Sequence, residues 1–400
     1  MKYIMLVGDG MSGRPLDELN GRTTLEVAER RYMDEITKRG KLGIATTIPK
    51  GMTPASDVAN LSLLGYNPKK YYSGRGPLEA VNIGVDLSDA DVAFRCNLVT
   101  QEEDGMIDYS AGHISSKEAR VLIEKIDSSL GNEKIKFYPG VSYRHLMVFR
   151  TGSKEEAIKI SGIKCMPPHD ILNKSILKNL PQGEGKEILT ELMNKSKKLL
   201  AQHDINKVRI DLGENPANMI WLWGQGIRPV MPSFKELYGV TGSIISAVDL
   251  IKGIGKIIGL EVINVPGATG FYDTNFKGKG EYALKSLEDK DFVFVHVEAA
   301  DEAGHNADIR AKITAIENFD KFVVGTIWEE YKAKKDFRIM VLPDHSTPIS
   351  VRTHTTDPVP FVICGDGIEA DGASVFTETA ARGSNFVFKE GHSLMKYLIA

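Results

Sequence analysis

The sequence has no long apolar run. No stretch approaches the roughly 20 apolar residues that a transmembrane helix needs, so we expect no membrane partner. At the N-terminus, an apolar run of only about five residues precedes Gly8 and Asp9, which is too short for the apolar core of a secretion signal. We interpret it as a first strand.

Cysteine is scarce, and the global charge is small. The 400 residues include three cysteines, Cys96, Cys165 and Cys364, which are scattered and lack metal-type spacing. This usage fits a reducing compartment, and we expect a cytoplasmic protein. A net charge of −3 gives no electrostatic case for nucleic acid or an anionic membrane as a partner. An anionic substrate would have to be bound by a local cluster of Arg and Lys.

The remaining composition is that of an ordinary globular protein, with 42% hydrophobic and 26% charged residues and no internal repeats. Short apolar runs alternate with longer amphipathic segments, which predicts an α/β fold with a largely parallel sheet flanked by helices. The expected strands are 3–7, 42–48, 219–223, 243–246, 261–265, 292–297, 337–342 and 360–364. The expected helices include 24–38, 117–130, 185–203, 249–258 and 308–334, the last with Asp308 as its N-cap.

A chain of 400 residues exceeds what one hydrophobic core usually supports. Residues 86–213 are richer in charge and include a lysine-rich helical segment from Lys186 to Lys198. We therefore predict a discontinuous core domain, residues 1–85 and 214–400, with residues 86–213 as an inserted, smaller α/β (α+β) lid domain.

Nucleotide-binding signatures are missing or misleading. Gly8-Asp-Gly10-Met-Ser-Gly13 follows a strand and matches G-x-G-x-x-G. A dinucleotide-binding turn, however, leads directly into a helix, and here a polar segment beginning at Arg14 intervenes. Asp9 would also face a pyrophosphate unfavourably unless a cation lay between them. No G-x-x-x-x-G-K-[ST] sequence occurs.

Asp and His residues, by contrast, recur at strand ends and in loops. Asp301 and His305 have helical i, i+4 spacing, which places both side chains on one face. An isolated pair of this kind is more often an N-capping Asp with a surface His. A second pair, Asp344 and His345, follows another apolar strand and shifts the interpretation towards metal binding. The full set of metal-type residues is Asp9, Ser56, Asp301, His305, Asp344, His345 and His354.

Mixed Asp and His ligands suit Mn²⁺, Zn²⁺ or Co²⁺ better than Ca²⁺. Ser56 precedes a probable helix, and two interpretations stay open from the residues alone. Its hydroxyl is an N-cap, or it is a nucleophile activated by a metal ion. His296, inside a strand, is interpreted as a core histidine.

Arginine, histidine and lysine residues elsewhere are candidates for binding an anion. Arg95 and Arg144 stand out because each lies among apolar or aromatic neighbours, where a charge needs a partner. His113 and Lys252 complete the set. Each of these taken alone is more often a solvated charge.

Long sequence strings carry a resemblance to a known family. They are Pro54-Ala-Ser56-Asp-Val-Ala-Asn-Leu-Ser-Leu-Leu-Gly-Tyr66, Gly74-Arg-Gly-Pro-Leu-Glu-Ala80, Glu298-Ala-Ala-Asp301-Glu-Ala-Gly-His305 and Pro343-Asp-His345. The chain resembles the cofactor-independent phosphoglycerate mutases, specifically the archaeal-type branch of the alkaline phosphatase superfamily. The resemblance implies an alkaline-phosphatase-like core. The family's Pro-Gly-Ser-Asp is Pro54-Ala-Ser56-Asp here, so the glycine beside the serine is lost.

By that resemblance, Ser56 becomes phosphorylated while 3-phosphoglycerate and 2-phosphoglycerate interconvert, without bisphosphoglycerate. Two divalent cations are implied, with Mn²⁺ preferred over Zn²⁺, Co²⁺ or Mg²⁺. One would be held by Asp301, His305 and His354, and the other by Asp9, Ser56, Asp344 and His345. Arg95, His113, Arg144 and Lys252 match positions that bind the small phosphorylated substrate.

Other functions remain open from the sequence. A phosphotransferase with another acceptor, such as homoserine, and a metal-dependent phosphomonoesterase would need the same metal site. A catalytically inactive metal-binding scaffold conflicts with the intact set of seven residues. The oligomeric state is not indicated by the sequence.

Overall fold

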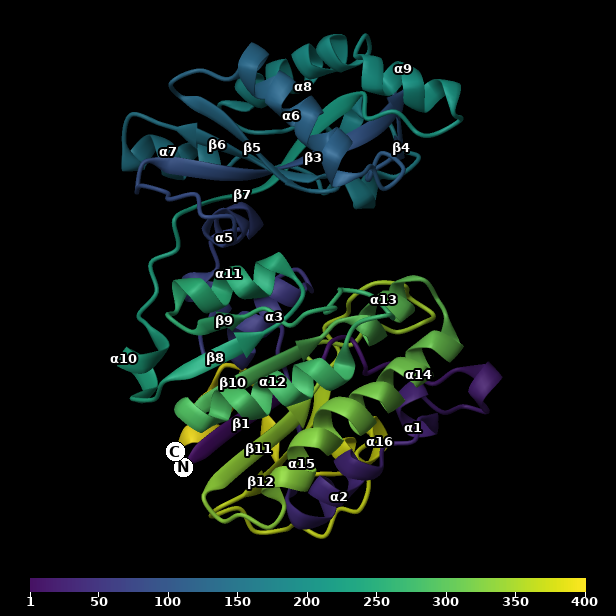
Figure 1. The fold of residues 1–400 in the computed structure, drawn as a ribbon, viewed down its shortest axis with the longest axis vertical. Coiled ribbons are helices and arrows are strands. Elements are labelled where there is room, and N and C mark those ends of the chain that lie inside the picture. The colour runs from purple at the N-terminus through teal and green to yellow at the C-terminus, as the bar shows by residue number, and fades with distance from the viewer. The chain divides into compact units, whose positions relative to one another are not determined.

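The computed structural model describes residues 1–400, and the chain forms two compact units. Unit 1 contains Met1–Tyr72 and Met231–Ala400, and unit 2 contains Ser73–Val230. Figure 1 shows the elements of both units. No helix in the structure combines the length and the apolar content that crossing a lipid bilayer requires.

Unit 1 is built on an eight-stranded sheet in the order β13-β2-β12-β11-β1-β10-β8-β9. The central strand β1 pairs in parallel with both β10 and β11, and only β12 runs against its neighbours. This confirms the expected α/β class with a largely parallel sheet. The strands are β1 (Lys2–Gly8), β2 (Lys41–Ala45), β8 (Gly242–Ile245), β9 (Glu261–Ile263), β10 (Phe292–Val297), β11 (Phe337–Leu342), β12 (Val359–Gly365) and β13 (Val387–Phe388).

Helices flank this sheet because its strands carry apolar side chains that alternate between the two faces. Ile4 and Leu6 of β1 belong to one core cluster with residues of the helices on the near face in Figure 1. The helices of unit 1 are η1 (Asp17–Leu19), α1 (Thr24–Val27), α2 (Arg31–Arg39), α3 (Ser56–Leu63), α4 (Pro68–Tyr71), α10 (Phe234–Tyr238), α11 (Asp249–Ile257), α12 (Phe276–Asp289), α13 (Ala299–His305), α14 (Ile309–Asn318), the π-helical η4 (Phe319–Val324), α15 (Gly325–Tyr331), α16 (Glu378–Arg382) and α17 (Ser393–Ile399).

Unit 2 contains an antiparallel five-stranded sheet with its own core. Its longest strand, β3, pairs with β4, β6 and β7. The strands are β3 (Asp91–Glu102), β4 (Gly105–Asp108), β5 (Ile135–Val141), β6 (Arg144–Arg150) and β7 (Met219–Ile227). The helices are α5 (Arg75–Asn82), α6 (Ser116–Leu130), α7 (Lys154–Ser161), η2 (Pro168–Ile171), η3 (Leu177–Asn179), α8 (Lys186–Leu200) and α9 (Asp204–Asp211).

The unit boundaries lie at 72/73 and 230/231 instead of the expected 85/86 and 213/214. The difference comes from two elements that pack on β3. Helix α5 contacts β3 and β7, and β7 pairs with β3 along most of its length. The expected strand 219–223 therefore belongs to the sheet of unit 2 and not to the core domain, in which the expected boundary at 213/214 placed it.

The expected helix 24–38 is two helices, because the chain breaks between α1 and α2. The Nη1 atom of Arg30 donates to the carbonyls of Leu25 and Ala28 at 2.9 Å, which satisfies acceptors at the end of α1. The carboxylate of Asp320 accepts the backbone N–H groups of Tyr32 and Met33 at the start of α2. Side chains distant in sequence thus fix this break, which helical periodicity alone does not reveal.

Candidate functional site

Three neighbouring strands of unit 1 end at the same edge of the sheet. Because β10, β1 and β11 are parallel neighbours, residues that follow their carboxyl ends are brought together. Asp9 directly follows β1, Asp301 lies in α13 just after β10, and Asp344 and His345 follow β11. His354 comes from the loop between β11 and β12. This topology gathers the predicted metal-type residues at one place.

Asp301, His305 and His354 converge on one point. Nε2 of His305 lies 3.1 Å from Oδ2 of Asp301 and 3.0 Å from Nε2 of His354. Nε2 of His354 lies 3.4 Å from Oδ1 of Asp301. Helix α13 supplies the i, i+4 pair expected from the sequence.

Asp9, Asp344 and His345 form the adjoining part of the cluster. Nε2 of His345 lies 3.4 Å from Oδ1 of Asp9 and 3.5 Å from Oδ2 of Asp344. One potential ligand atom from each of Asp9, Asp301 and His345 lies within 4.8 Å of the others. Asp301 therefore links this group to the group formed with His305 and His354.

Ser56 joins this cluster as the first residue of α3. The N-cap of α3 is Ala55, which makes no side-chain capping bond. The Ser56 hydroxyl lies 3.1 Å from Nε2 of His345, so it faces the cluster and does not cap the helix. Asn60, one turn later, donates from Nδ2 to the Ser56 carbonyl and to Oδ2 of Asp344, both at 2.8 Å. The structure therefore brings together all seven residues singled out in the sequence.

The histidine tautomers show that this donor set fits a cation. Nδ1 of His305 lies 3.0 Å from the carbonyl of Arg352, and a carbonyl only accepts, so Nδ1 carries the proton. Neutral His305 then presents its Nε2 lone pair to the carboxylate of Asp301 and to the ring of His354. Lone pairs that face each other at this distance repel unless a cation or an extra proton lies between them.

His345 is also fixed in one tautomer by a neighbouring oxygen. The Thr347 hydroxyl donates its one proton to Oδ1 of Asp301, so it accepts from Nδ1 of His345 at 3.2 Å. Nε2 of neutral His345 therefore presents a lone pair to Asp9, Asp344 and Ser56. Oδ1 of Asp9 is buried without a hydrogen-bond partner, as expected for a carboxylate oxygen meant for a cation.

The shifted pKa values in the cluster also agree with a site for a cation. Burial, reinforced by the carboxylates of Asp344 and Asp301, raises the pKa of Asp9 well above its usual value. Burial also lowers the pKa of His345, to about 4, against the opposing charge of Asp344. Burial alone would lower the pKa of His305, but hydrogen bonding and charge from Asp301 raise it to about 9. Without cations, the cluster relieves its carboxylate repulsion by taking up protons.

Backbone and buried side chains hold the loops that carry Asp9 and Asp344 in place. Gly10 has φ +59°, and a Cβ there would lie 2.6 Å from Oδ1 of Asp301. Lys312 is fully buried, and its Nζ donates to the carbonyls of Thr347 at 2.6 Å and Ser12 at 3.3 Å. These contacts link the loop after β1 to the loop after β11.

In unit 2, Arg95 is the most buried member of the predicted anion-binding set. Its buried guanidinium pairs with Glu79, with Nε 3.0 Å from Oε1, and lies over the ring of Trp223 at 4.4 Å. The Arg144 guanidinium lies 4.7 Å from the Tyr143 ring centroid. His113 packs edge-on against Tyr143, with ring centroids 6.0 Å apart.

Arg95 and Arg144 share one face of the unit 2 sheet. Asn97 lies two residues beyond Arg95 on β3 and pairs directly with Arg144 on β6, so all three side chains point to the same side. His169 extends this surface, since its ring centroid lies 5.4 Å from that of Trp223. Lys252, the fourth predicted residue, lies half-buried on α11 in unit 1.

The surroundings of His296 were not predicted from the sequence. His296 is fully buried, yet its Nε2 lies 3.4 Å from Oδ2 of Asp9 and 3.7 Å from Oδ2 of Asp344. Its Nδ1 has no well-formed hydrogen bond, so the interpretation as a satisfied core histidine was wrong. One feature of the sequence could have indicated this: His296 lies near the end of strand β10, which pairs with the strand that leads to Asp9.

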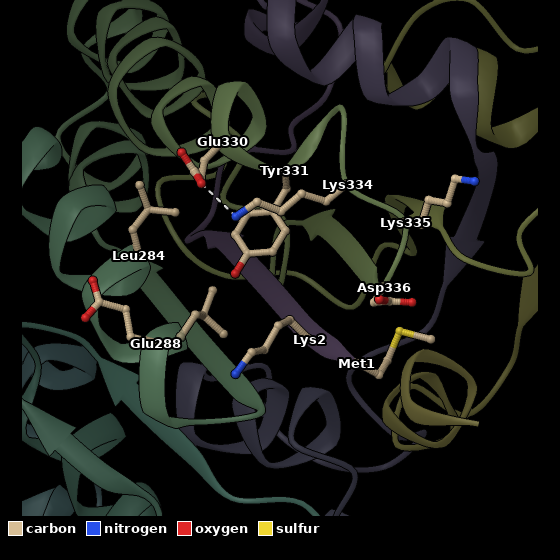
Figure 2. A pocket seen from close by; sticks show the side chains of 10 residues that line it. Met1, Lys2, Leu284, Glu288, Glu330, Tyr331, Lys334, Lys335 and Asp336 are labelled. Carbon is tan, nitrogen blue, oxygen red and sulfur yellow. Dashed lines mark hydrogen bonds and ion pairs between the residues drawn. The ribbon is translucent and has the colours of Figure 1, made fainter.

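One pocket of unit 1 lies away from this cluster. It has a volume of roughly 840 Å³ and includes Lys2 at the start of β1, whereas Asp9 follows the end of that strand. Figure 2 shows Tyr331 in this pocket, with Lys334 beside it paired to Glu330. The lining carries both charge signs and includes none of the seven residues of the cluster.

Comparisons with known proteins identify relatives that align with this chain along nearly their whole length. Residues 37–206 match a family model described as 2,3-bisphosphoglycerate-independent phosphoglycerate mutase. A Methanosarcina barkeri protein of that name is 50% identical over 401 residues, covering 100% of this chain and 99% of the relative. A Geobacter sulfurreducens protein, named as a probable enzyme of the same kind, is also 50% identical and is covered completely.

Two solved structures are similar to this chain over its whole length. A protein from Pyrococcus horikoshii superposes with a TM-score of 0.84 at 31% identity, covering 100% of this chain and 98% of the other. A cofactor-independent phosphoglycerate mutase from Thermoplasma acidophilum gives a TM-score of 0.64 at 29% identity, with coverage of 100% and 99%.

Proposed function

We propose that this chain, which belongs to the 2,3-bisphosphoglycerate-independent phosphoglycerate mutase family, interconverts 3-phosphoglycerate and 2-phosphoglycerate. It is then an isomerase that moves a phosphoryl group within one molecule, in glycolysis or gluconeogenesis. The observation that carries this proposal is the position of the Ser56 hydroxyl, 3.1 Å from Nε2 of His345, within a cluster of three Asp and three His. The free state of all three cysteines supports a cytoplasmic location.

Mixed Asp and His donors support divalent cations such as Mn²⁺, Zn²⁺ or Co²⁺. We propose two cations, with Mn²⁺ preferred over Zn²⁺, Co²⁺ or Mg²⁺ as the family resemblance implies. Asp301, His305 and His354 would hold one, and Asp9, Ser56, Asp344 and His345 would hold the other. When bound, such cations lower the pKa of a coordinated hydroxyl and offset the charge of the phosphoryl oxygens.

The reaction proceeds in two transfers. Oγ of Ser56 attacks the phosphorus of 3-phosphoglycerate, the bond from phosphorus to the C3 oxygen breaks, and the serine proton passes to that oxygen. The products are phosphoserine and glycerate. The C2 hydroxyl of the same glycerate then attacks phosphoserine and returns its proton to Ser56, which yields 2-phosphoglycerate.

Helix α3 positions the nucleophile for this role. Asn60 donates to both the Ser56 carbonyl and Asp344, so it ties the first turn of the helix to the loop after β11. Tyr72 donates from its hydroxyl to Oδ2 of Asp57 at 2.7 Å, and Oδ1 of Asp57 accepts from the N–H of Val58. We assign Asp57 to fixing the start of α3 and not to proton transfer.

Arg95, His113, Arg144 and Lys252 are proposed to bind the anionic groups of the substrate. The support is the surface in unit 2 on which two guanidinium groups lie against aromatic rings. Such a surface holds a carboxylate or phosphate through charge-assisted bonds. Retaining glycerate between the two transfers is essential, because water reaching phosphoserine would make the enzyme a phosphatase.

The test is ³¹P NMR of 3-phosphoglycerate with the Mn²⁺-loaded protein and no bisphosphoglycerate. A 2-phosphoglycerate signal that grows to equilibrium supports the proposal. Release of inorganic phosphate without any 2-phosphoglycerate overturns it. That outcome indicates a phosphomonoesterase, or a phosphotransferase whose acceptor, such as homoserine, was missing.

A further inference from the structure

A chain of buried polar groups extends behind the metal-type cluster into the core of unit 1. It runs from Lys279 on α12 through Glu298 to His296 on β10 and then to Asp9. All four residues are at most 4% exposed, so each charge or polar atom needs a partner within the protein.

Glu298 is held rigidly at the centre of this chain. Its Oε2 accepts from Nζ of Lys279 at 2.6 Å. Its Oε1 accepts from the Ser246 hydroxyl and the Ala247 N–H, each at 2.8 Å. Lys279 also donates to the carbonyl of His296 at 2.8 Å. One lysine thus fixes both the backbone of His296 and the carboxylate beside its ring.

The His296 ring lies between two sets of carboxylates. Nδ1 lies 3.4 Å from Oε1 of Glu298, and Nε2 lies 3.4 Å from Oδ2 of Asp9. Only a ring nitrogen that carries a proton approaches a carboxylate favourably at this distance. Nδ2 of Asn60 also lies 3.5 Å from Nε2 of His296, but its two protons go to the Ser56 carbonyl and to Oδ2 of Asp344, so Nε2 can donate. On Asp9, His296 faces Oδ2, whereas His345 faces Oδ1. The ring therefore stands on the side of Asp9 that points away from His345.

We propose that His296 is a positioning residue, which donates from Nε2 to Oδ2 of Asp9 and thereby aims Oδ1 of Asp9 into the metal site. Glu298 and Lys279 hold the His296 ring in the orientation that this bond requires. His296 lies near Asp9 and Asp344, which belong to one proposed metal site. The other proposed site consists of Asp301, His305 and His354, which His296 does not approach. Loss of His296 should therefore weaken the binding of only one of the two cations, the one held by Asp9 and Asp344. The inference rests on the proposed metal site but does not depend on which phosphoryl acceptor is used.

The test is calorimetric titration of metal-free protein with Mn²⁺, with the two binding steps fitted separately. His296→Leu should weaken one step at least tenfold and leave the other within about threefold. His296→Gln places an amide N–H near the position of Nε2, so it should restore the weakened step to within about threefold of wild type. Glu298→Gln should weaken the same step as His296→Leu, because it loosens the support of the ring.

His145→Leu is the matched control. His145 is also a buried histidine, at 3% exposure, but it lies in the core of unit 2, where its Nδ1 accepts from the N–H of Gly140. This variant should leave both Mn²⁺ steps unchanged.

Two results would overturn the inference. If His296→Leu and Glu298→Gln both bind Mn²⁺ like wild type, His296 does not position Asp9. If His296→Gln binds as weakly as His296→Leu, an N–H donor at this position does not account for the effect, and the inference fails. If His296→Leu fails to fold, the His296→Gln and Glu298→Gln variants still test the inference. Because the readout is Mn²⁺ binding, the test does not depend on mutase activity.

Discussion

The Ser56 hydroxyl lies 3.1 Å from Nε2 of His345, although 289 positions separate the two residues in the chain. Ser56 begins α3, and His345 follows β11. The proton on Nδ1 of His345 is held by Thr347, so the lone pair of Nε2 faces the serine oxygen. This contact unites the proposed nucleophile with the proposed metal ligands.

Replacing Ser56, the proposed nucleophile, should separate catalysis from metal binding. Ser56→Ala is expected to abolish turnover, while metal content, measured by atomic emission, stays near that of wild type, because the Asp and His ligands are untouched. Alanine suits the first turn of a helix, so α3 should persist. Retained mutase activity in this variant would contradict the phosphoserine mechanism.

Gly10 should be intolerant of a side chain. With φ +59° and a Cβ position 2.6 Å from both Oδ1 of Asp301 and Oγ1 of Thr347, Gly10→Ala combines backbone strain of about 1–2 kcal/mol with displacement of Asp301, a proposed metal ligand. We expect lower stability in urea unfolding and weaker Mn²⁺ binding. Gly13→Ala is the control, because its nearest neighbour lies 3.9 Å away. Equal behaviour of the two variants would refute this account of the turn.

Lys312 should contribute strongly to stability. Burial lowers its pKa to about 8 despite the nearby charge of Asp301, so it remains mostly protonated at neutral pH. Lys312→Met leaves the carbonyl group of Thr347 without its donor, at about 1–3 kcal/mol for an unsatisfied group, whereas the Ser12 carbonyl still accepts from the Thr347 N–H. Urea unfolding should show this loss. Lys332→Met, which removes a partly exposed lysine paired to Glu329, should stay within about 0.5 kcal/mol of wild type.

Asp320 should make stability depend on pH. Burial raises the pKa of Asp320 to about 7, although two backbone N–H groups oppose the shift. The folded protein then holds this proton up to a higher pH than the unfolded chain, so the contribution is present at low pH and is lost as pH rises through about 7. Asp320→Asn should flatten the change in unfolding free energy between pH 5.5 and 8. An unchanged slope would show that Asp320 titrates normally.

Removing metal should destabilise unit 1 most at high pH. The raised pKa of Asp9 means that the metal-free fold is helped by a proton, and this help is lost as pH rises through the folded-state pKa. Chelation should therefore lower the melting temperature more at pH 8 than at pH 5.5. A metal-free protein that melts like the loaded protein at both pH values would exclude a structural cation in the cluster.

Much of the fold was predictable because it rests on local patterns. The parallel strands at 3–7, 292–297 and 337–342 were visible as apolar runs, and Asp308 caps α14 as expected, accepting from the Ala311 N–H. The break between α1 and α2 was missed because it depends on Asp320, nearly 300 residues away. Strand β7 was misplaced because its partner, β3, was itself not recognised among charged neighbours.

Some residues of the site were likewise predictable from the sequence, and others were not. Asp9, Asp301 and Asp344 were identifiable because a carboxylate after an apolar strand is poorly explained by packing. His296 lies within such a strand, and its orientation depends on Glu298 and Lys279, which converge only in three dimensions. Likewise, nothing in the sequence indicates that Asn60 links Ser56 to Asp344.

The central claim is that Ser56 carries the phosphoryl group between two oxygens of glycerate. The most direct measurement is mass spectrometry of the protein quenched in acid during turnover of 3-phosphoglycerate, followed by digestion. The account predicts a phosphorylated peptide in which Ser56 bears the phosphate, and its absence without substrate. Phosphate on a different residue, with 2-phosphoglycerate forming at the full rate, would contradict the account.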